Sequence, residues 1–333
     1  MPYFSIIIPV YNRPDEVDEL LESLSKQTFL DFEVLLIEDG SSIKCDVVAQ
    51  KYNHLINIRY YLKENSGRSE TRNYGMEKAK GEYFVFFDSD CVIPSFYFEK
   101  IKKTLSENYT DSYGGPDKAD KSFNQLQKAI SFSMTSFLTT GGIRGSKGTK
   151  LEKFVPRTFN MGFSKEVYKE VGEFKDMFGE DIDLSLRIRN KGYTCQLIPD
   201  AFVYHKRRVD LRSFYRQVHV FGMARISIYL LHSSSLKIVH TLPALFTIIS
   251  LIIIFVSLFN IWILTPLIIY FGLIFIVSSI EYKNISIGFI SIITSGIQLY
   301  AYGWGFIKSY VKKVMFTNNE TGEKELEKYY NKK

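Results

Sequence analysis

The sequence has 333 residues, with 42 lysine and arginine against 36 aspartate and glutamate residues, for a formal net charge of +6. This length predicts about two domains, and 46% apolar with 15% aromatic residues excludes a disordered chain. Three widely spaced cysteines, Cys45, Cys91 and Cys195, form no CxxC pair and are odd in number, which excludes a disulfide framework and predicts a reducing compartment.

Strand and helix patterns alternate over the first ninety residues. Apolar runs predict strands at 3–9, 32–38, 57–62 and 82–87, and helical spacing predicts helices at 15–27, 43–52 and 69–80. Helices that alternate with strands predict an α/β fold, a mostly parallel sheet wound with crossover helices. Ligands of such sheets bind beyond the carboxyl ends of the strands.

Polar residues follow the predicted strands at this edge. Asp88 and Asp90 come directly after the buried strand, two residues apart, where two carboxylates can face one divalent cation such as Mg²⁺. A solvated turn is the alternative, since Asp and Ser are common turn residues. The chain has no GxGxxG after a strand and no GxxxxGK[ST], which argues against a dinucleotide fold and a P-loop.

A second acidic site precedes the helical pattern that begins near residue 184. It consists of Asp176, Glu180, Asp181 and Asp183. Acids are favoured at a helix N-terminus by the helix dipole, which accounts for one or two of them. A carboxylate at this place is equally suited to act as a general base.

The last third of the chain is apolar. Residues 241–280 contain no Asp, Glu, Lys or Arg, and residues 285–307 form a second uncharged run. Forty helical residues would extend about 60 Å, twice the roughly 30 Å hydrocarbon core, so we predict two spans that break near Asn260. The second run predicts a third span or, because Ser291, Ser295, Gln298 and Tyr302 form a polar stripe, an interfacial or re-entrant segment. A buried hairpin in a soluble core is the alternative.

Charge predicts the orientation of the chain. No signal peptide is recognisable near Met1, and residues 202–240 carry seven basic side chains against one acid, Asp210. The positive-inside rule then keeps residues 1 to about 235 on the side of synthesis. The basic stretch could contact anionic headgroups or a phosphorylated lipid, whereas no recognition motif supports nucleic acid as a partner.

Four segments in order resemble a family-2 glycosyltransferase with the GT-A, nucleotide-diphospho-sugar transferase fold. They are SIIIPVYNR (5–13), LLIEDGSS (35–42), NSGRSETRNYGMEKAKGEYFVFFDSD (65–90) and NMGFSKEVYKEVGEFKDMFGEDIDLSLRIRNKGY (160–193). The resemblance covers roughly residues 3–205. It implies a GT-A catalytic domain over 1–209. Charge and apolar runs predict a basic juxtamembrane helix over 210–240, a transmembrane region of two to three helices over 241–307 and a basic tail over 308–333.

The resemblance also implies site residues. The residues that match nucleotide-sugar contacts are Pro9, Tyr11, Asn12, Asp39, Arg72, Asn73 and Asp88. Asp90 matches the ligand of a Mn²⁺ or Mg²⁺ ion that bridges the diphosphate, and His205 matches a further metal ligand of some relatives, with a plain strand-ending histidine as the alternative. Asp181 matches the catalytic base, and Glu180 a residue that holds the acceptor.

The expected activity is inverting transfer of one sugar from a nucleotide-diphosphate sugar to a hydroxyl of a glycan or lipid-linked acceptor. The enzyme would lie at the inner (plasma) membrane with its catalytic domain in the cytoplasm. The Q/RxxRW signature of processive synthases is missing, which disfavours polymer extrusion. A polyprenyl-phosphate sugar transferase and a non-catalytic membrane scaffold are the alternatives. Residues 141–150, rich in glycine and basic residues, form either a lid over a phosphorylated ligand or a plain surface loop.

Overall fold

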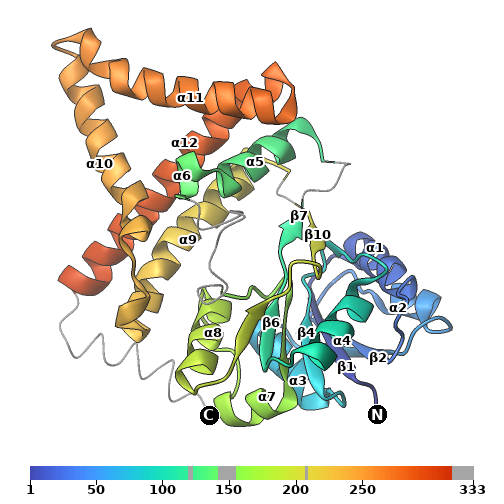
Figure 1. The fold of residues 1–333 in the computed structure, drawn as a ribbon. Helices are drawn as coiled ribbons and strands as arrows, with labels where there is room; N and C mark the ends of the chain where they lie inside the picture. Colours follow the sequence, from blue (N-terminus) through green and yellow to red (C-terminus); the bar gives the residue numbers. More distant parts are fainter. Residues whose placement is uncertain (119–122, 142–154, 207–208, 317–333) are drawn as a thin grey trace. The chain divides into compact units, whose positions relative to one another are not determined.

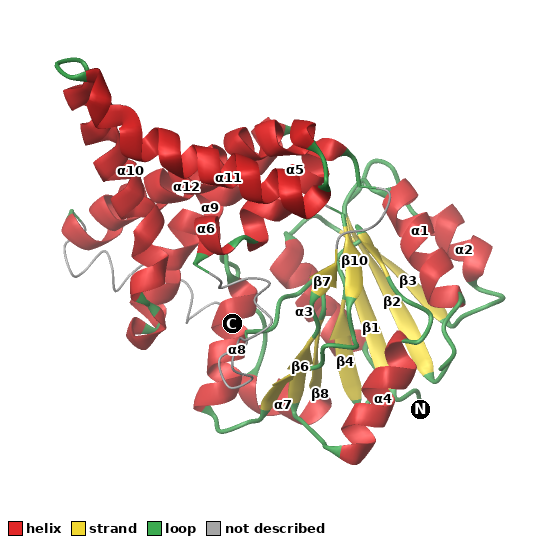
Figure 2. Ribbon diagram, turned by 45° about the horizontal axis from the view of Figure 1, so that its top comes forward, coloured by secondary structure: helices red, strands yellow, loops and turns green. Residues whose placement is uncertain are grey.

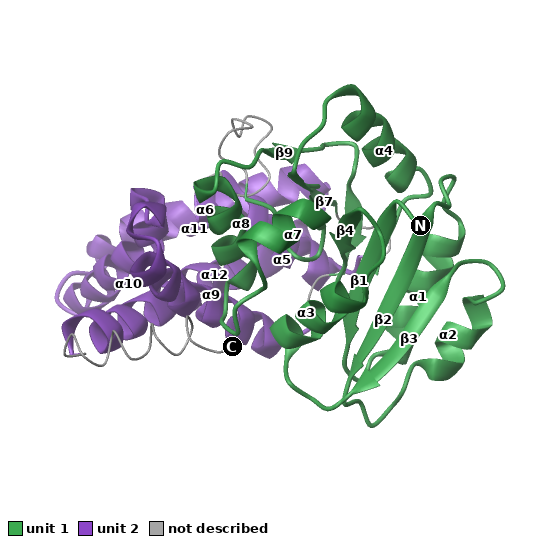
Figure 3. Cartoon of the chain, turned by 90° about the horizontal axis from the view of Figure 1, so that it is seen from below, with its two compact units in different colours: residues 1–120, 149–206 green, residues 121–148, 207–333 purple. Residues whose placement is uncertain are grey.

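The computed structural model describes residues 1–118, 123–141, 155–206 and 209–316 (Figure 1). The chain divides into two compact units, coloured separately in Figure 3. Unit 1 comprises residues 1–120 and 149–206, and unit 2 comprises residues 121–148 and 207–333. Most of the predicted 141–150 loop, and most of the tail after 308, lie outside the described residues.

Unit 1 is built on a seven-stranded sheet of order β3-β2-β1-β4-β8-β6-β9. Its strands are β1 (Phe4–Val10), β2 (Phe32–Asp39), β3 (Ile58–Lys63), β4 (Tyr83–Phe86), β6 (Ser112–Gly114), β8 (Met161–Ser164) and β9 (Cys195–Leu197). The first four strands are parallel, β8 runs antiparallel to both of its neighbours, and β9 is parallel to β6. The predicted mostly parallel α/β sheet is confirmed.

Helices cover both faces of this sheet (Figure 2). Because side chains alternate along a strand, Ile6 and Ile8 of β1 point into one core and Ile7 into the other. The first core is shared with α1 (Pro14–Ser25), α2 (Asp46–Tyr52) and α4 (Tyr97–Glu107). The second is shared with α3 (Arg68–Lys78), α7 (Lys165–Val171) and α8 (Glu180–Asn190). Burial on both faces explains why apolar residues follow one another without a break over 6–10 in β1 and 34–37 in β2.

A small second sheet, of order β5-β10-β7, lies in the same unit. Its strands are β5 (Cys91–Val92), β7 (Asp117–Lys118) and β10 (Val203–His205). β5 follows the Asp88–Asp90 segment at the end of β4, and β10 pairs with it antiparallel, with His205 opposite Cys91. The chain just before residue 207 is thereby brought to the carboxyl edge of the large sheet.

Unit 2 is helical. Its main elements are α5 (Gln125–Thr135), α6 (Phe137–Thr140), α9 (Leu211–Leu231), α10 (Ile238–Ser257), α11 (Thr265–Tyr282) and α12 (Ile285–Tyr310). Three helical stretches are long and apolar enough to cross a membrane: 238–257, 261–282 and 285–315. The predicted breaks are confirmed, because Asn260 and Asn284 each accept a backbone N–H of the next helix through their side chains. Such capping satisfies the free donors at a helix start.

Candidate functional site

The ends of β1 and β2 are joined by Asn12. Its Oδ1 accepts hydrogen bonds from Ser42 Oγ and the backbone N–H of Ile43, both at 3.0 Å, and its own N–H donates to Ser41 Oγ at 2.8 Å. Asn12 has a positive φ of 54°, a conformation that asparagine tolerates better than most residues. Beside it, Tyr11 is 53% exposed at the edge of the sheet. The amide of Asn12 thus fixes the loop that presents Tyr11.

Asp39 is the last residue of β2; it is buried, and its carboxylate accepts several hydrogen bonds. Its carboxylate accepts from Lys63 Nζ at 2.6 Å and from the backbone N–H groups of Ser66 and Gly67, both at 2.9 Å. Burial alone would raise the pKa of Asp39, but these donors outweigh it, and the pKa is lowered. Asp39, one of the predicted nucleotide-sugar contacts, therefore holds the loop between β3 and α3 in place.

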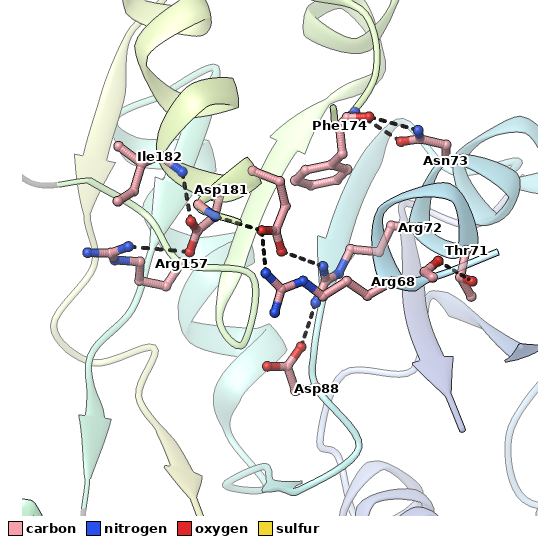
Figure 4. Close-up of polar contacts among 12 residues, drawn as sticks. Arg68, Thr71, Arg72, Asn73, Asp88, Arg157, Phe174, Asp181 and Ile182 are labelled. Atoms are coloured by element: carbon pink, nitrogen blue, oxygen red, sulfur yellow. Dashed lines mark hydrogen bonds and ion pairs between the residues drawn. The ribbon is translucent and has the colours of Figure 1, made fainter. Parts of the chain in front are cut away.

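Arg72 of α3 links the two acidic sites (Figure 4). Its Nη2 lies 2.8 Å from Asp88 Oδ1, and its Nη1 lies 3.0 Å from Glu180 Oε1. Arg68, one helical turn earlier, places its Nη2 2.8 Å from Glu180 Oε2. The guanidinium of Arg72 is almost fully buried, as is the carboxylate of Glu180. The strand-edge acid at 88 and the helix-start acid at 180 are thus held by one rigid group.

Glu180 is a buried carboxylate between charges of both signs. Burial is the largest influence and raises its pKa; the neighbouring Asp181 also raises it, while Arg72 and Arg68 lower it, and the net direction is upward. Glu180 also accepts the N–H of Gly179 at 3.1 Å. These contacts within the protein hold the Glu180 carboxylate at the start of α8.

Asp181 is the more accessible acid of the pair. Its Oδ1 accepts the N–H of Ile182 at 2.8 Å, and its Oδ2 lies 3.5 Å from Nη1 of Arg157 (Figure 4). Asp181 sits in the first turn of α8, where the helix dipole favours a carboxylate. Arg157 was missed in the sequence, where no pattern distinguishes it from the other basic residues.

Asn73 is held away from solvent. Its Nδ2 donates to the carbonyl of Phe174 at 2.9 Å, and its Oδ1 accepts the N–H of the same residue at 2.9 Å. Both halves of the amide are therefore used to bind the backbone of one residue, Phe174. The phenyl ring of Phe174 in turn lies 5.8 Å from the guanidinium carbon of Arg72. Asn73 supports the position of Arg72.

The two predicted metal ligands lie together. His205 Nε2 is 3.1 Å from Asp90 Oδ1, and the N–H of Lys206 donates to the Asp90 carbonyl at 3.0 Å. Candidate ligand atoms of Asp90, Cys91 and His205 all lie within 4.8 Å of one another. The imidazole stacks on Phe159 with ring centroids 4.7 Å apart. Asp88 turns to Arg72 instead, so the two acids of the DSD segment have different partners.

The donor chemistry of this cluster suits a hard or borderline cation. A carboxylate oxygen and an imidazole nitrogen are ligands that Mn²⁺ accepts. Cys91 is buried, and burial raises the pKa of its thiol well above the ordinary value, with the Asp90 and Asp88 charges adding to the effect. A thiol that stays protonated is a poor ligand. The residues present therefore fit Mn²⁺ or Mg²⁺ better than a thiolate-bound ion.

Comparison with known proteins identifies the family of this chain. Residues 5–172 match the sequence profile of Glycosyl transferase family 2. Glycosyltransferase AglE of Haloferax volcanii is 25% identical over 248 residues, covering 73% of this chain and 79% of AglE. The uncharacterised glycosyltransferase EpsJ of Bacillus subtilis is 33% identical over 115 residues, 34% of this chain and 33% of EpsJ. The minor teichoic acid biosynthesis protein GgaB of the same species is 36% identical over 111 residues, 32% of this chain and 12% of GgaB.

Among solved structures, the mannosyltransferase PcManGT of Pyrobaculum calidifontis, in complex with GDP-Man and Mn²⁺, has a similar fold. The TM-score is 0.58 at 14% sequence identity, over 95% of this chain and 88% of that one. This likeness concerns the fold, a GT-A-like sheet with helices on both faces. The profile match over residues 5–172, half of the sequence, shows that this chain is a member of glycosyltransferase family 2.

Proposed function

We propose that this protein is a membrane-anchored inverting glycosyltransferase. It transfers one sugar from a nucleotide-diphosphate sugar to a hydroxyl group of a glycan or lipid-linked acceptor. The observation that carries the proposal is the bridge Asp88–Arg72–Glu180, with contacts of 2.8 and 3.0 Å. It ties the edge where a nucleotide would bind to the helix that bears the candidate base.

Asp181 is the proposed base. One carboxylate oxygen takes the proton of the acceptor hydroxyl as the hydroxyl oxygen attacks the anomeric carbon, on the side opposite the departing diphosphate. The contact with Arg157 at 3.5 Å and the N–H of Ile182 at 2.8 Å orient the carboxylate for this step. A positioned general base typically contributes 10²–10⁴-fold. Glu180, at the start of the same helix, is proposed to position the acceptor.

The donor would lie along the carboxyl ends of β1, β2 and β4. Pro9, Tyr11, Asn12 and Asp39 are proposed to form or support the nucleotide pocket, because the loop of Asn12 and the loop of Asp39 both lie at this edge. Asp88 is proposed to contact the ribose; Arg72 and Asn73 hold it in position. Asp90 and His205 would hold Mn²⁺ or Mg²⁺, which when bound neutralises charge on the leaving diphosphate.

The proposal is tested by transfer assays on the full chain in detergent, with a panel of nucleotide sugars and Mn²⁺ or Mg²⁺. Asp181→Asn is expected to lower turnover by at least 10²-fold, because an amide cannot take the proton. Asp31→Asn, an exposed acid just before β2 and therefore at the opposite end of that strand from the site, is the matched control and keeps wild-type turnover. Near-normal turnover of Asp181→Asn with the authentic acceptor would disprove the base assignment.

The same assay separates the alternatives. A polyprenyl-phosphate acceptor is already ionised and needs little proton removal, so transfer to it would survive Asp181→Asn. A scaffold would release no nucleoside diphosphate from any donor. An inverting enzyme gives a product of opposite anomeric configuration to its donor, which NMR of the product measures directly.

A further inference from the structure

The beginning of α10 and the end of α12 lie side by side in unit 2. A Cβ added at Gly303 would come within 2.4 Å of the Pro243 carbonyl oxygen, so the two backbones touch here. Phe306 packs with Ala244 in one apolar cluster. Thr247 Oγ1 lies 3.5 Å from the carbonyl of Leu299, further back along α12. The two helices are therefore antiparallel, and the apolar region begins and ends at the same place.

α9 leads to this same place. Ser309 Oγ donates to the carbonyl of Met223 at 3.3 Å, and Lys313 Nζ lies 3.2 Å from Ser227 Oγ. Contacts that advance in step along both helices mean that α9 and the last turns of α12 run in parallel. The segment that enters the apolar region and the segment that leaves it are thus neighbours. Three complete crossings would place them on opposite faces of a membrane.

α12 is also contacted along its length by two helices that carry charged residues, α5 and α9. Thr294 Oγ1 donates to the carbonyl of Ala129 in α5 at 3.1 Å, and the carbonyl of Ala301 lies 3.2 Å from Nδ1 of His219 in α9. α5 and α9 carry the charged residues Lys128, Arg212, Arg216 and Arg225. If α12 spanned the bilayer, these helices would follow it into the hydrocarbon. Charged side chains at that depth are costly.

The corner between α10 and α11, by contrast, is uncharged and apolar. Residues 258–264 carry no charge, and Leu258, Phe259 and Trp262 are 78–80% exposed. In Figures 1 and 2 this corner stands away from α12. Such a large exposed apolar tip needs a cover. Apart from Asn260 and the indole N–H of Trp262 its side chains are apolar, and a hydrocarbon phase covers them without any further protein surface.

The reach of this corner is short. Phe246 of α10 contacts Tyr270 of α11 and Tyr300 of α12, with ring centroids 5.3 and 5.6 Å apart, so the three helices meet at this level. From Phe246 to Ser257, where α10 ends, the helix rises about 16 Å at 1.5 Å per residue. The hydrocarbon core is about 30 Å thick. The corner therefore reaches no deeper than about the middle of a bilayer when α12 lies at its surface.

Charges mark both ends of α12 and leave the corner bare. Glu281 and Lys283 lie at the turn between α11 and α12. At the other end, α9, α10 and α12 bring their basic residues to one region: Arg225, Lys237, Lys308, Lys312 and Lys313. Between 211 and 316 there are eight basic residues and one acid. This excess suits anionic headgroups, which attract basic side chains near the membrane surface.

We infer that unit 2 is a one-sided membrane anchor. α12 lies in the headgroup region with α5 and α9 on its aqueous side, the α10–α11 corner dips into the near leaflet, and the chain leaves the membrane on the face where it entered. Length and composition allow three spans, but the contacts of α12 favour a re-entrant segment. The inference rests on the membrane anchoring in the proposed function.

The test introduces one exposed cysteine per variant into the full chain and labels it with a membrane-impermeant maleimide. The background is Cys195→Ser, because Cys45 and Cys91 are buried. Lys308→Cys probes the end of α12, Phe259→Cys the corner, and Lys26→Cys, exposed in unit 1, is the control. Membrane vesicles of both orientations are compared before and after solubilisation. We expect Lys308→Cys and Lys26→Cys to react in the same vesicles, and Phe259→Cys to react only after solubilisation.

Two results would overturn the inference while membrane anchoring stands. They are reaction of Lys308→Cys only in the vesicles where Lys26→Cys is protected, and reaction of Phe259→Cys from the face opposite Lys26→Cys. A different result would remove the anchoring itself. In that case the wild-type chain stays soluble without detergent, and Phe259→Cys reacts as fast as Lys26→Cys. The transfer assay is unaffected by either outcome, so the catalytic proposal is judged separately.

Discussion

At the scale of single residues, Arg72 determines how the candidate site is assembled. A buried guanidinium that faces two carboxylates is stable only while both partners are present, because each charge pays a large desolvation cost. Its contacts with Asp88 and Glu180 fix the end of β4 against the start of α8. Asn73, one residue later, clamps Phe174 beside it. The geometry of two loops thus depends on one turn of α3.

Arg72→Met is therefore expected to destabilise unit 1 by about 3 kcal/mol, since it leaves Glu180 buried beside a single cation. That corresponds to a fall of roughly 6–12 °C in Tm for a unit of this size. Arg13→Met is the matched control: it breaks an Arg–Glu contact of 2.6 Å whose two side chains are partly exposed, and should cost less than about 1 kcal/mol.

Thermal unfolding followed by circular dichroism measures both variants. Adding Glu180→Gln to Arg72→Met should recover part of the lost stability, because it removes the uncompensated charge. Equal Tm values for Arg72→Met and Arg13→Met would show that the Arg72 bridge contributes no more than a surface ion pair.

At the scale of elements, the sequence predicts the central strands of unit 1. It does not predict which distant strand pairs with β5, or which residue contacts Asp90. Apolar runs of the right length predict β1, β2 and β4, because burial on both faces demands them. The pattern also suggested that Asp88 and Asp90 face one cation. In the structure β4 ends at Phe86, β5 begins at Cys91 and pairs with β10, and Asp90 is turned toward His205. A pairing with a strand more than a hundred residues away leaves no local signal.

The close approach of α12 to α10 at Gly303 gives a testable prediction. Gly303→Ala should lower the thermal stability of the detergent-solubilised chain, because the new Cβ would overlap the backbone of α10 at Pro243. Gly272→Ala in α11 is the matched control, with nothing within 4 Å of its Cβ, and should gain about 0.5–1 kcal/mol from lower backbone entropy in the unfolded chain.

The two glycine variants have the same chemical change in the same kind of helix, so the sign of the difference reports packing alone. Scanning fluorimetry in detergent is sufficient to rank them. A Gly303→Ala chain as stable as Gly272→Ala would mean that α10 and α12 do not approach as closely as described.

At the scale of the whole molecule, the two units are interleaved in the sequence. α5 and α6 stand between β7 and β8 of unit 1 in the sequence, yet they belong to the helices of unit 2. The expected domain boundary near 209 follows a change in composition, but the apolar residues of α5 look the same whichever core they enter. Ile130 and Met134 pack with Phe214, Val218 and Ala301, all from the second half of the chain. Which core a short amphipathic helix packs into is decided by tertiary contacts, and the periodicity of its apolar residues does not predict it.

This interleaving predicts the fate of a truncated chain. A fragment of residues 1–209 keeps α5 but loses α9 and α12, so that Ile130 and Met134 lose their apolar partners. We expect the fragment to aggregate, since an uncovered apolar helix face associates with other chains. The double substitution Ile130→Gln and Met134→Gln in the fragment should restore a monomer in size-exclusion chromatography, because it removes the exposed face and leaves the sheet of unit 1 unchanged.

The same double substitution in the full chain should have the opposite effect and destabilise unit 2, by burying two amides where α5 meets α12. A monomeric unsubstituted fragment would contradict the assignment of α5 to unit 2.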